Sequence, residues 1–362
     1  ITTRAALICT GSVAAAPPIP GLAEAGFVTN EDVFDLDNMP ASLVVIGGGP
    51  TGVELGQAFH RLGSKVTILE AKPWLLPTAD GEACDELFDI LQCEGLTLAT
   101  NAPVESVRVA EGRKVVQARI DGVQRDFHGD EILVAAGRKP NMDGLGLEAI
   151  GVEFSPKGIV VDKTMRTTVK NIYAAGDVTG GLFMTHVAAT EATTAALNAL
   201  APPIRRKMSY RVVPWATFTD PEVAGVGLTE MQARQKHGRV RVVRLPWREI
   251  DRAHTDGDTR GFIKLVLAGA TERLVGAHLV GRGAGELLPE LAQVIRQRKG
   301  LDAIVYTIHA YPTLSIGLQQ AAWRGMQTSA SWGYLQKGLS PLLRVLALCL
   351  KQCEMAAREA LA

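Results

Sequence analysis

Three glycines in residues 43–72 have the spacing that dinucleotide phosphates require. They follow the pattern Gly-x-Gly-x-x-Gly: Gly47 allows a tight turn, Gly49 lets the backbone approach a pyrophosphate, and Gly52 lets a helix pack closely. A helix that begins there points free N–H groups and its positive dipole end at the phosphates. The pattern therefore predicts a dinucleotide-binding site.

A carboxylate is part of the same predicted dinucleotide-binding site. Glu70 stands where its oxygens can accept hydrogen bonds from the hydroxyls of an adenosine ribose. A carboxylate there would repel a 2′-phosphate, so Glu70 favours NADH over NADPH, whereas the neighbouring Lys72 weakens that preference. A glycine triplet alone is often only a turn, but the acid and the flanking apolar segments make a nucleotide site the better interpretation.

A strand–helix–strand unit is needed to hold these residues. Residues 43–46 are continuously apolar, as in a buried parallel strand, a helical pattern ends near Leu62, and a second apolar strand covers residues 66–69. Elsewhere the patterns predict helices near residues 80–94, 186–200, 229–237, 284–299 and 301–307. They predict strands at residues 5–9, 96–100, 104–109, 114–120, 131–135, 212–218, 223–228, 240–246, 261–267 and 274–280.

The composition limits the kinds of protein that this chain can be. Its 362 residues are 47% hydrophobic and 21% charged, as in a globular protein of two or three domains. Lys plus Arg and Asp plus Glu both number 38, so no excess charge points to nucleic acid or to an anionic membrane. No apolar run reaches the ~20 residues that span a bilayer, and there is no signal peptide. We therefore expect a cytoplasmic protein with no transmembrane segment.

Five scattered cysteines do not form the disulfide framework of a small secreted protein. They are Cys9, Cys84, Cys93, Cys349 and Cys353. The chain begins at Ile1, and residues 3–10 already have the pattern of a core strand. We therefore expect an N-terminal piece to be absent from this sequence.

Several further motifs, taken in order, resemble one known family. The resemblance covers about residues 1–321 and is to the class I FAD-dependent pyridine nucleotide–disulfide oxidoreductases. The matching segments are Thr10-Gly11-Ser12 with Pro20-Gly21, residues 136–141, Ile172 to Asp177, residues 214–222, residues 261–265 and residues 284–287. The family's chains begin with a FAD-binding Gly-x-Gly-x-x-Gly and a redox Cys-x4-Cys, and neither is present in this sequence.

The resemblance implies an α/β fold with Rossmann-like FAD- and NAD(P)-binding domains and a C-terminal α+β dimerisation domain. The expected divisions are residues 1–36 as a remnant of the FAD-binding domain, 37–156 as the NAD(P)-binding domain, 157–205 as the C-terminal part of the FAD-binding domain, 206–322 as the dimerisation domain and 323–362 as a helical tail. A homodimer is expected.

The resemblance also assigns flavin contacts. Asp177 would hydrogen-bond the ribityl chain of FAD, and Thr185-His186 would begin a helix whose N-terminus faces the N1/O2 edge of the flavin. The imidazole of His186 itself is expected to be structural. The cofactor-binding residues that the resemblance implies in these segments are Thr10, Gly11, Gly137, Asp177, Thr185 and His186.

Glu54 is the first candidate catalytic residue. In the family the corresponding glutamate pairs with a lysine near flavin N5 and helps to bring the nicotinamide to the ring. Glu54 lies two residues after the glycine motif, whereas that lysine would lie in the absent segment. The alternative is that an acid near the start of a helix is simply favoured by the helix dipole.

Tyr311 is the second candidate catalytic residue. In dihydrolipoamide dehydrogenase and glutathione reductase a His-Pro-x4-Glu motif supplies acid–base chemistry to a thiol. Tyr311 takes the place of that His and Ile316 the place of that Glu. A phenol with a pKa near 10 is a poor proton shuttle at neutral pH. A tyrosine here is similar to the mercuric reductase-like branch, where it lies near the metal in the partner subunit's active site. His309 either reaches this site or bonds locally.

No resident metal is predicted. Mercuric reductases end with a vicinal Cys-Cys pair, whereas this chain has Cys349 and Cys353, which would share one face of a helix. Two such thiols can hold a soft metal, but core packing is the better interpretation. The apolar run at residues 339–348 is likewise expected to pack on the protein.

The resemblance therefore implies a flavoprotein that passes a hydride from NAD(P)H, with NADH favoured, to FAD and then to a thiol or soft-metal acceptor, as in Hg(II) reduction. The acceptor would be a small molecule or a metal ion, with no nucleic-acid partner. One alternative is a dihydrolipoamide dehydrogenase-like disulfide oxidoreductase. The other is a non-catalytic nucleotide-binding homodimer.

Overall fold

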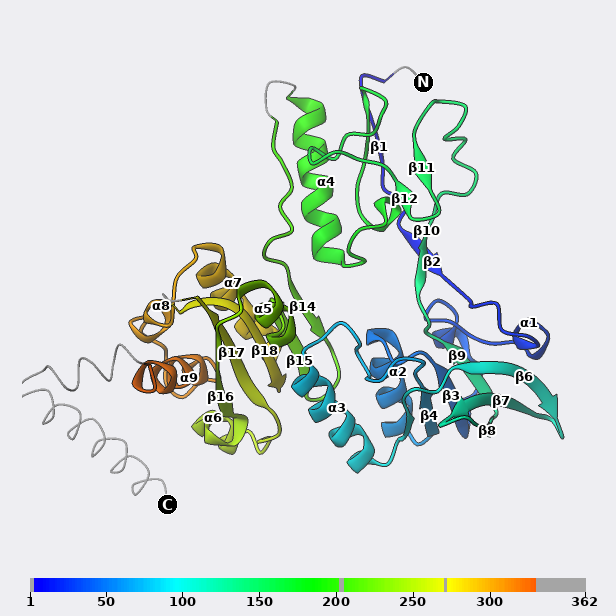
Figure 1. Ribbon diagram of the computed structural model, residues 1–362. Helices are drawn as coiled ribbons and strands as arrows, with labels where there is room; N and C mark the ends of the chain where they lie inside the picture. Colours follow the sequence, from blue (N-terminus) through cyan, green and yellow to red (C-terminus); the bar gives the residue numbers. More distant parts are fainter. Residues whose placement is uncertain (1–2, 202–204, 270–271, 330–362) are drawn as a thin grey trace, which may run out of the picture.

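The computed structural model describes residues 3–201, 205–269 and 272–329, which form three groups of elements (Figure 1). A central unit contains the glycine motif, a C-terminal unit is built on an antiparallel sheet, and a third group brings together the start of the chain and residues 138–200. Within these residues no helix is both long and apolar enough to cross a bilayer. The predicted α/β fold is confirmed.

The central unit is a four-stranded parallel sheet in the order β5-β4-β3-β9. Its strands are β3 (Ser42–Ile46), β4 (Lys65–Leu69), β5 (Thr97–Ala99) and β9 (Glu131–Val134). Every residue of β3 is buried, as its apolar run predicts for a central parallel strand. Helices α2 (Pro50–Arg61) and α3 (Gly81–Glu94) connect the strands, and the short α1 (Leu22–Ala25) and η1 (Val33–Asp35) precede them.

A three-stranded antiparallel meander is attached to this sheet. It consists of β6 (Val104–Ala110), β7 (Arg113–Ile120) and β8 (Val123–Gly129). The first two strands were predicted and β8 was not. Five of its seven residues are exposed, so it has no alternating apolar pattern from which a strand could be recognised.

The third group is assembled from distant segments. β1 (Ala6–Ile8) pairs in parallel with β13 (Ile172–Ala174), and β2 (Ser12–Ala14) pairs antiparallel with β10 (Arg138–Pro140). Helix α4 (Thr185–Leu200) follows the turn η2 (Asp177–Thr179). The small hairpin of β11 (Phe154–Ser155) and β12 (Gly158–Ile159) completes the group.

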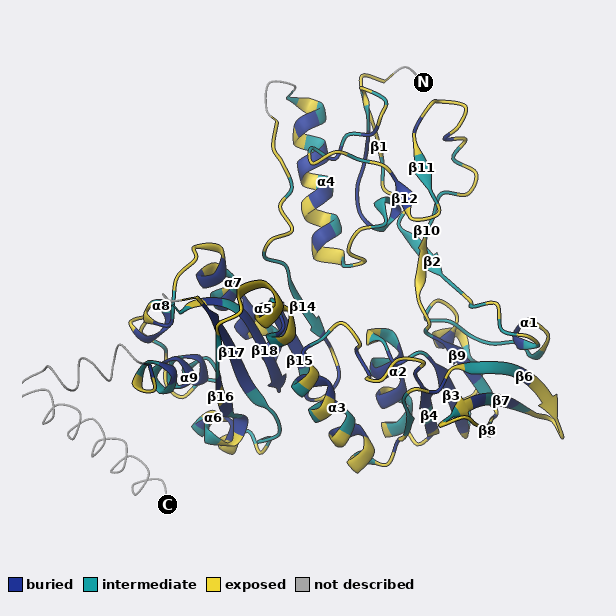
Figure 2. Ribbon diagram, in the orientation of Figure 1, coloured by how far each residue is buried: buried dark blue, intermediate teal, exposed yellow. Residues whose placement is uncertain are grey.

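The C-terminal unit is a five-stranded antiparallel sheet in the order β14-β15-β18-β17-β16. Its strands are β14 (Pro214–Thr217), β15 (Glu222–Gly227), β16 (Val240–Pro246), β17 (Phe262–Ala268) and β18 (Arg273–Gly281). Its helices are α5 (Glu230–His237), η3 (Trp247–Glu249), α6 (Asp251–Thr255), η4 (Ala284–Leu287), α7 (Leu288–Arg296), α8 (Asp302–Val305) and α9 (Ile316–Gln327). Strands β17 and β18 are mostly buried and appear dark blue in Figure 2.

Several elements differ from the prediction: helix α6 and the part of α9 before residue 323, for example, were not predicted. The helix predicted over residues 284–299 is a 3₁₀ turn followed by α7, because Pro289 stands in the first turn where a new helix begins readily. Helix α9 continues through the expected boundary at residue 322, and Trp323 and Met326 pack against the core of the C-terminal unit. Cys349, Cys353 and the rest of the predicted tail lie outside the described residues. The domain boundaries themselves remain a proposal.

The central and C-terminal units share a core. Helix α3 packs against β18, and the apolar cluster around Leu87 and Leu91 continues to Val223 and Val280 of the antiparallel sheet. This contact fixes the glycine motif relative to the C-terminal unit.

Candidate functional site

The glycine loop joins β3 to α2, and Gly47, Gly49 and Gly52 are each required for a different structural reason. Gly47 has φ +112°, a left-handed conformation that other residues adopt poorly, and a Cβ on Gly52 would lie 1.9 Å from the Gly47 carbonyl oxygen. A Cβ on Gly49 would meet nothing within 4 Å. The loop therefore packs tightly on its inner side and leaves open space at Gly49, where a pyrophosphate would approach.

The start of α2 faces this space. Gly49 is the N-cap, no side chain caps the helix, and Pro50 occupies its first turn. The free N–H groups and the positive end of the helix dipole are thus available to an anion.

Glu70 does more than the sequence predicted. The residue is 8% exposed. Oε2 accepts a hydrogen bond from Gly48 N at 2.7 Å and Oε1 accepts one from Lys72 N at 2.7 Å. Because each carboxylate oxygen can accept more than one hydrogen bond, a ribose hydroxyl can still donate to it. Glu70 therefore also holds the glycine loop in place.

The two segments that resemble flavin motifs meet although they are far apart in the sequence. Ser12 Oγ donates to Asp177 Oδ2 at 2.5 Å across 165 residues, and Thr10 Oγ1 donates to the Asn141 carbonyl at 2.6 Å. Gly137 has φ +147° and its carbonyl accepts from Ala15 N. Gly137 therefore fixes the turn that leads into β10.

A groove of about 570 Å³ runs along these segments. Gly11, Asp177 and Thr185 line it, together with Ala188, Ala189 and Ala192 of α4. No side chain caps the first turn of α4, so its N–H groups are free there. The small residues leave room for a flat ring system, and the free N–H groups suit an electron-rich edge. These features fit FAD, for which Asp177 would be the ribityl partner.

His186 does not line this groove. Its ring Nε2 lies 2.8 Å from the Pro214 carbonyl oxygen and thereby ties α4 to the start of β14. The structure thus gives its imidazole a structural role.

Glu191 was missed by the sequence reasoning. It is 2% exposed, its Oε2 accepts from Gly176 N at 2.7 Å, and its Oε1 accepts from the Tyr210 hydroxyl at 2.5 Å. Burial, with help from the Glu191 carboxylate, raises the pKa of Tyr210. Glu191 therefore holds the turn before Asp177. In the sequence, Glu191 is the single acidic residue of a helix rich in alanine and threonine, which could have marked it as unusual. The pattern does not indicate which groups Glu191 would contact.

Glu54 lies on α2 and points towards the C-terminal unit. Its Oε1 accepts a hydrogen bond from Phe218 N at 2.7 Å. Burial raises the pKa of Glu54, and the hydrogen bond from Phe218 opposes that effect. Within the described residues this carboxylate joins the glycine helix to the loop after β14.

Tyr311 and His309 share a segment but have separate partners. Tyr311 is 58% exposed and its hydroxyl donates to Asp251 Oδ2 at 3.0 Å, which raises the pKa of the phenol. The His309 side chain is only 4% exposed, with Nε2 3.0 Å from Glu290 Oε2 and Nδ1 2.9 Å from the Thr307 carbonyl oxygen. The local bonding that the sequence allowed for His309 is therefore the arrangement observed.

Two models of one protein family match most of this chain. The family model described as pyridine nucleotide-disulphide oxidoreductase matches residues 1–193, and that of the same family's dimerisation domain matches residues 213–322. The chain belongs to the pyridine nucleotide-disulphide oxidoreductase family.

Relatives within the family carry more than one name. Mercuric reductase from Bacillus cereus is 38% identical over 322 residues, which are 89% of this chain and 51% of that protein. Dihydrolipoyl dehydrogenase from Thermus scotoductus is 39% identical over 326 residues, 87% of this chain and 68% of that protein. The Cu(II) complex of the HOCl-induced flavoprotein disulfide reductase RclA from Escherichia coli is 33% identical, with a TM-score of 0.81 over 87% of this chain and 73% of that one.

The chain spans 51% of the length of the mercuric reductase from Bacillus cereus and 59% of that from Staphylococcus aureus. Relatives of both names are comparably similar, so the comparisons show the family, whose members depend on FAD and a pyridine nucleotide, without deciding the acceptor.

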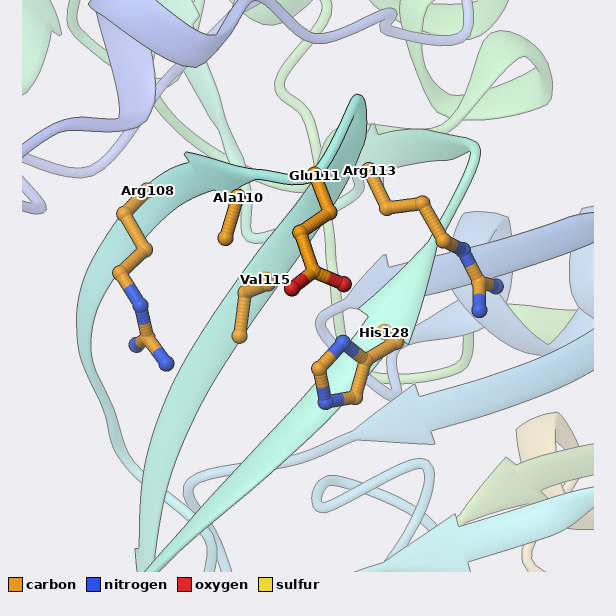
Figure 3. A pocket seen from close by; sticks show the side chains of 6 residues that line it. All are labelled: Arg108, Ala110, Glu111, Arg113, Val115 and His128. Atoms are coloured by element: carbon orange, nitrogen blue, oxygen red, sulfur yellow. The ribbon is translucent and has the colours of Figure 1, made fainter.

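A second hollow lies on the meander, away from these sites (Figure 3). Arg108, Glu111, Arg113 and His128 line it, and the Glu111 carboxylate points into it between the two arginines. Arg108 pairs with Asp126, and Arg113 lies 3.5 Å from Asp130. Because these cations already have partners, the hollow is not a candidate anion site.

Proposed function

We propose that the protein takes a hydride from NAD(P)H, with NADH favoured, and passes two electrons through FAD and a thiol pair to a thiol-bound soft metal such as Hg(II). The observation that carries the choice of acceptor is the pair Tyr311 and Ile316. A phenol whose pKa is raised by Asp251 and an alkyl side chain occupy the places of an acid–base dyad. A metal ion, unlike a disulfide, needs no proton from such a dyad.

The overall reaction balances without an acid–base pair at the acceptor. NAD(P)H and Hg²⁺ give NAD(P)⁺, H⁺ and Hg⁰: the hydride supplies two electrons to the metal and leaves as a proton. FAD, when bound, supplies the hydride-accepting ring between the two.

The residues of this chain have distinct roles in the proposal. Gly49 and the start of α2 bind the pyrophosphate, Glu70 binds the ribose, and Asp177 with the first turn of α4 holds FAD. Glu54 orients the nicotinamide. Tyr311 lines the acceptor site of the partner subunit in a homodimer, so dimerisation is a condition of activity.

A dihydrolipoamide dehydrogenase-like activity is the second candidate. The His309–Glu290 contact favours it, because this is a histidine–carboxylate pair two residues from Tyr311. Against it, both ring nitrogens of His309 face oxygen acceptors and the side chain is almost fully buried, so neither nitrogen is open to a substrate thiol.

The first experiment is an assay of nicotinamide oxidation at 340 nm. Since this sequence contains no Cys-x4-Cys pair, the assay uses the chain within a polypeptide that supplies one. Rates are measured with NADH and NADPH, with and without Hg(II) buffered by excess thiol, and then with lipoamide. We expect Hg(II)-dependent turnover that is faster with NADH. Lipoamide turnover at a rate matching or exceeding that with Hg(II) would establish the second candidate instead.

A matched pair of variants tests the role of Tyr311. Tyr311→Phe should lower Hg(II)-dependent turnover by roughly tenfold, while Tyr306→Phe, on the same exposed segment, should leave it unchanged.

Flavin content decides the remaining alternative: a protein that binds NADH but holds no FAD would be a non-catalytic nucleotide-binding homodimer.

A further inference from the structure

A buried lysine joins the C-terminal unit to the central unit. Lys264 of β17 is 2% exposed, and its Nζ donates to Asp80 Oδ1 at 2.7 Å and to Glu82 Oε1 at 2.8 Å. Glu230 Oε2 lies 2.9 Å from the same Nζ. A buried ammonium requires such partners, because desolvation alone strongly disfavours its charge. Three carboxylates at the starts of α3 and α5 therefore converge on one cation.

Asp80 is the centre of this cluster. It is 2% exposed and is the N-cap of α3, where Oδ1 accepts from Glu82 N at 3.3 Å. Its other oxygen accepts from Glu230 N at 3.0 Å, at the start of α5. One carboxylate thus faces two helix N-termini and the Lys264 ammonium, all of which favour its negative charge.

The segment before Asp80 leads directly to the glycine loop. Ala79 N donates to the Leu76 carbonyl at 2.8 Å, and Leu76 N donates to the Gly48 carbonyl at 2.9 Å. Leu76 has φ +49°, which is unfavourable for a leucine and persists only where its surroundings impose it. The Leu75 side chain lies 2.5 Å from where a Cβ on Gly48 would be. Two backbone hydrogen bonds therefore connect the anchor at Asp80 with the phosphate-facing loop.

We propose that Lys264 is a positioning residue for the pyridine nucleotide: through Asp80 it holds residues 72–80 against Gly48, so that the C-terminal unit sets the shape of the glycine loop and its affinity for NADH. The inference rests on the proposed nucleotide site. It predicts that a substitution in the sheet of one unit weakens nucleotide binding in another.

A merely structural lysine would stabilise the protein without changing NADH affinity, and Gln57 provides the matched control. Gln57 is 3% exposed and crosses the same interface, with Nε2 2.8 Å from the Asp220 carbonyl oxygen and Oε1 accepting from Asp220 N at 2.8 Å. It lies on α2 rather than on residues 72–80. Lys264→Met and Gln57→Met therefore each replace a buried polar residue at the interface, and only the first removes the anchor of the glycine loop.

The experiment measures the Kd for NADH of the wild-type chain and of both folded variants by fluorescence titration, with hydrogen exchange of the amides in residues 46–57. Lys264→Met should raise the Kd roughly tenfold and speed the exchange, whereas Gln57→Met should change the Kd by about twofold or less. Asp80→Asn keeps a capping oxygen but weakens the contact with Lys264. It should raise the Kd in the same direction, and it serves where Lys264→Met fails to fold.

The outcomes separate this inference from the proposed function. A wild-type chain that binds NADH while Asp80→Asn and Lys264→Met stay within about twofold of it would overturn the role of Lys264 alone. Equal losses in Gln57→Met and Lys264→Met would also overturn it, because the effect would then belong to the interface in general. A wild-type chain that binds no NADH would remove both the nucleotide site and this inference.

Discussion

At the scale of single residues, Gly49 and Gly52 are glycines for opposite reasons. A side chain at position 52 would overlap the Gly47 carbonyl oxygen within the protein, whereas one at position 49 would project into open space. Stability and ligand binding therefore impose separate requirements on two residues of the same loop.

The corresponding substitutions should separate folding from binding. Gly52→Ala should lower stability by about 1–3 kcal/mol because α2 must move away from the loop. Gly49→Ala should leave the melting temperature nearly unchanged and weaken NADH binding at least roughly tenfold, because its methyl group occupies the approach of the pyrophosphate. Thermal melting and NADH titration of both variants check this. Normal NADH affinity in Gly49→Ala would mean that the phosphates bind elsewhere.

Glu70 should control the choice of coenzyme. Glu70→Ala removes the carboxylate that would repel a 2′-phosphate, so the ratio of the Kd for NADPH to the Kd for NADH should fall by roughly tenfold. The variant also loses the contacts with Gly48 N and Lys72 N, so both affinities should decrease somewhat. Lys72→Ala is the control and should shift the ratio the other way. An unchanged ratio in Glu70→Ala would assign coenzyme choice to other residues.

At the scale of elements, the starts of α3 and α5 depend on carboxylates kept ionised by neighbouring cations. The Arg244 guanidinium, helped by Lys264, lowers the pKa of Glu82 from 4.5 to about 2 against the effect of burial. Burial acts to raise the pKa values of Asp80 and Glu230, but the hydrogen bonds from Lys264, together with the Glu230 N–H for Asp80 and Arg234 for Glu230, lower both pKa values overall. The junction between the starts of α3 and α5 is therefore most stable at pH values at which these carboxylates are charged.

This junction should lose stability in acid. A carboxyl whose folded-state pKa is depressed binds fewer protons in the native state, so its contribution is complete above pH 4.5 and disappears as the pH falls towards about 2. Glu82→Gln should therefore flatten the dependence of melting temperature on pH in that window and have little effect on its shape above pH 6. Glu111→Gln, at an exposed carboxyl of the meander, is the comparison. If the melting temperature of Glu82→Gln fell with decreasing pH as steeply as that of the wild type, the role of Glu82 in acid stability would be contradicted.

At the scale of the whole molecule, the C-terminal unit exposes several large apolar side chains close together, as is typical of an interface with another protein. Ile308 is 95% exposed, Tyr306 76% and Tyr311 58%, all on the segment between α8 and α9. The family's dimerisation domain includes this segment. We propose that a second copy covers it.

A charge at the most exposed of these positions should therefore prevent dimerisation. Ile308→Asp should shift the protein from dimer to monomer in sedimentation or light scattering, since an unpaired buried charge is costly at an interface. Val123→Asp, at an exposed apolar position on the meander, should leave the dimer intact. A dimeric Ile308→Asp protein would place the interface elsewhere.

The sequence by itself determined the features that depend on neighbouring residues. The glycine spacing, Glu70 at the end of its strand, and most helices and strands follow from local patterns, because backbone conformation and alternating burial are read within a few residues. The exposed strand β8 was missed because it buries too little apolar surface to leave such a pattern.

Only the tertiary structure decided which distant groups meet. Ser12 finds Asp177 across 165 residues and Lys264 finds Asp80 across 184, while Glu191 closes on Gly176 and His309 on Glu290. A polar side chain has the same local signature whether it ends in solvent or in a buried cluster. Its partner is selected by the packing of whole elements, which excludes water and makes each unpaired group costly.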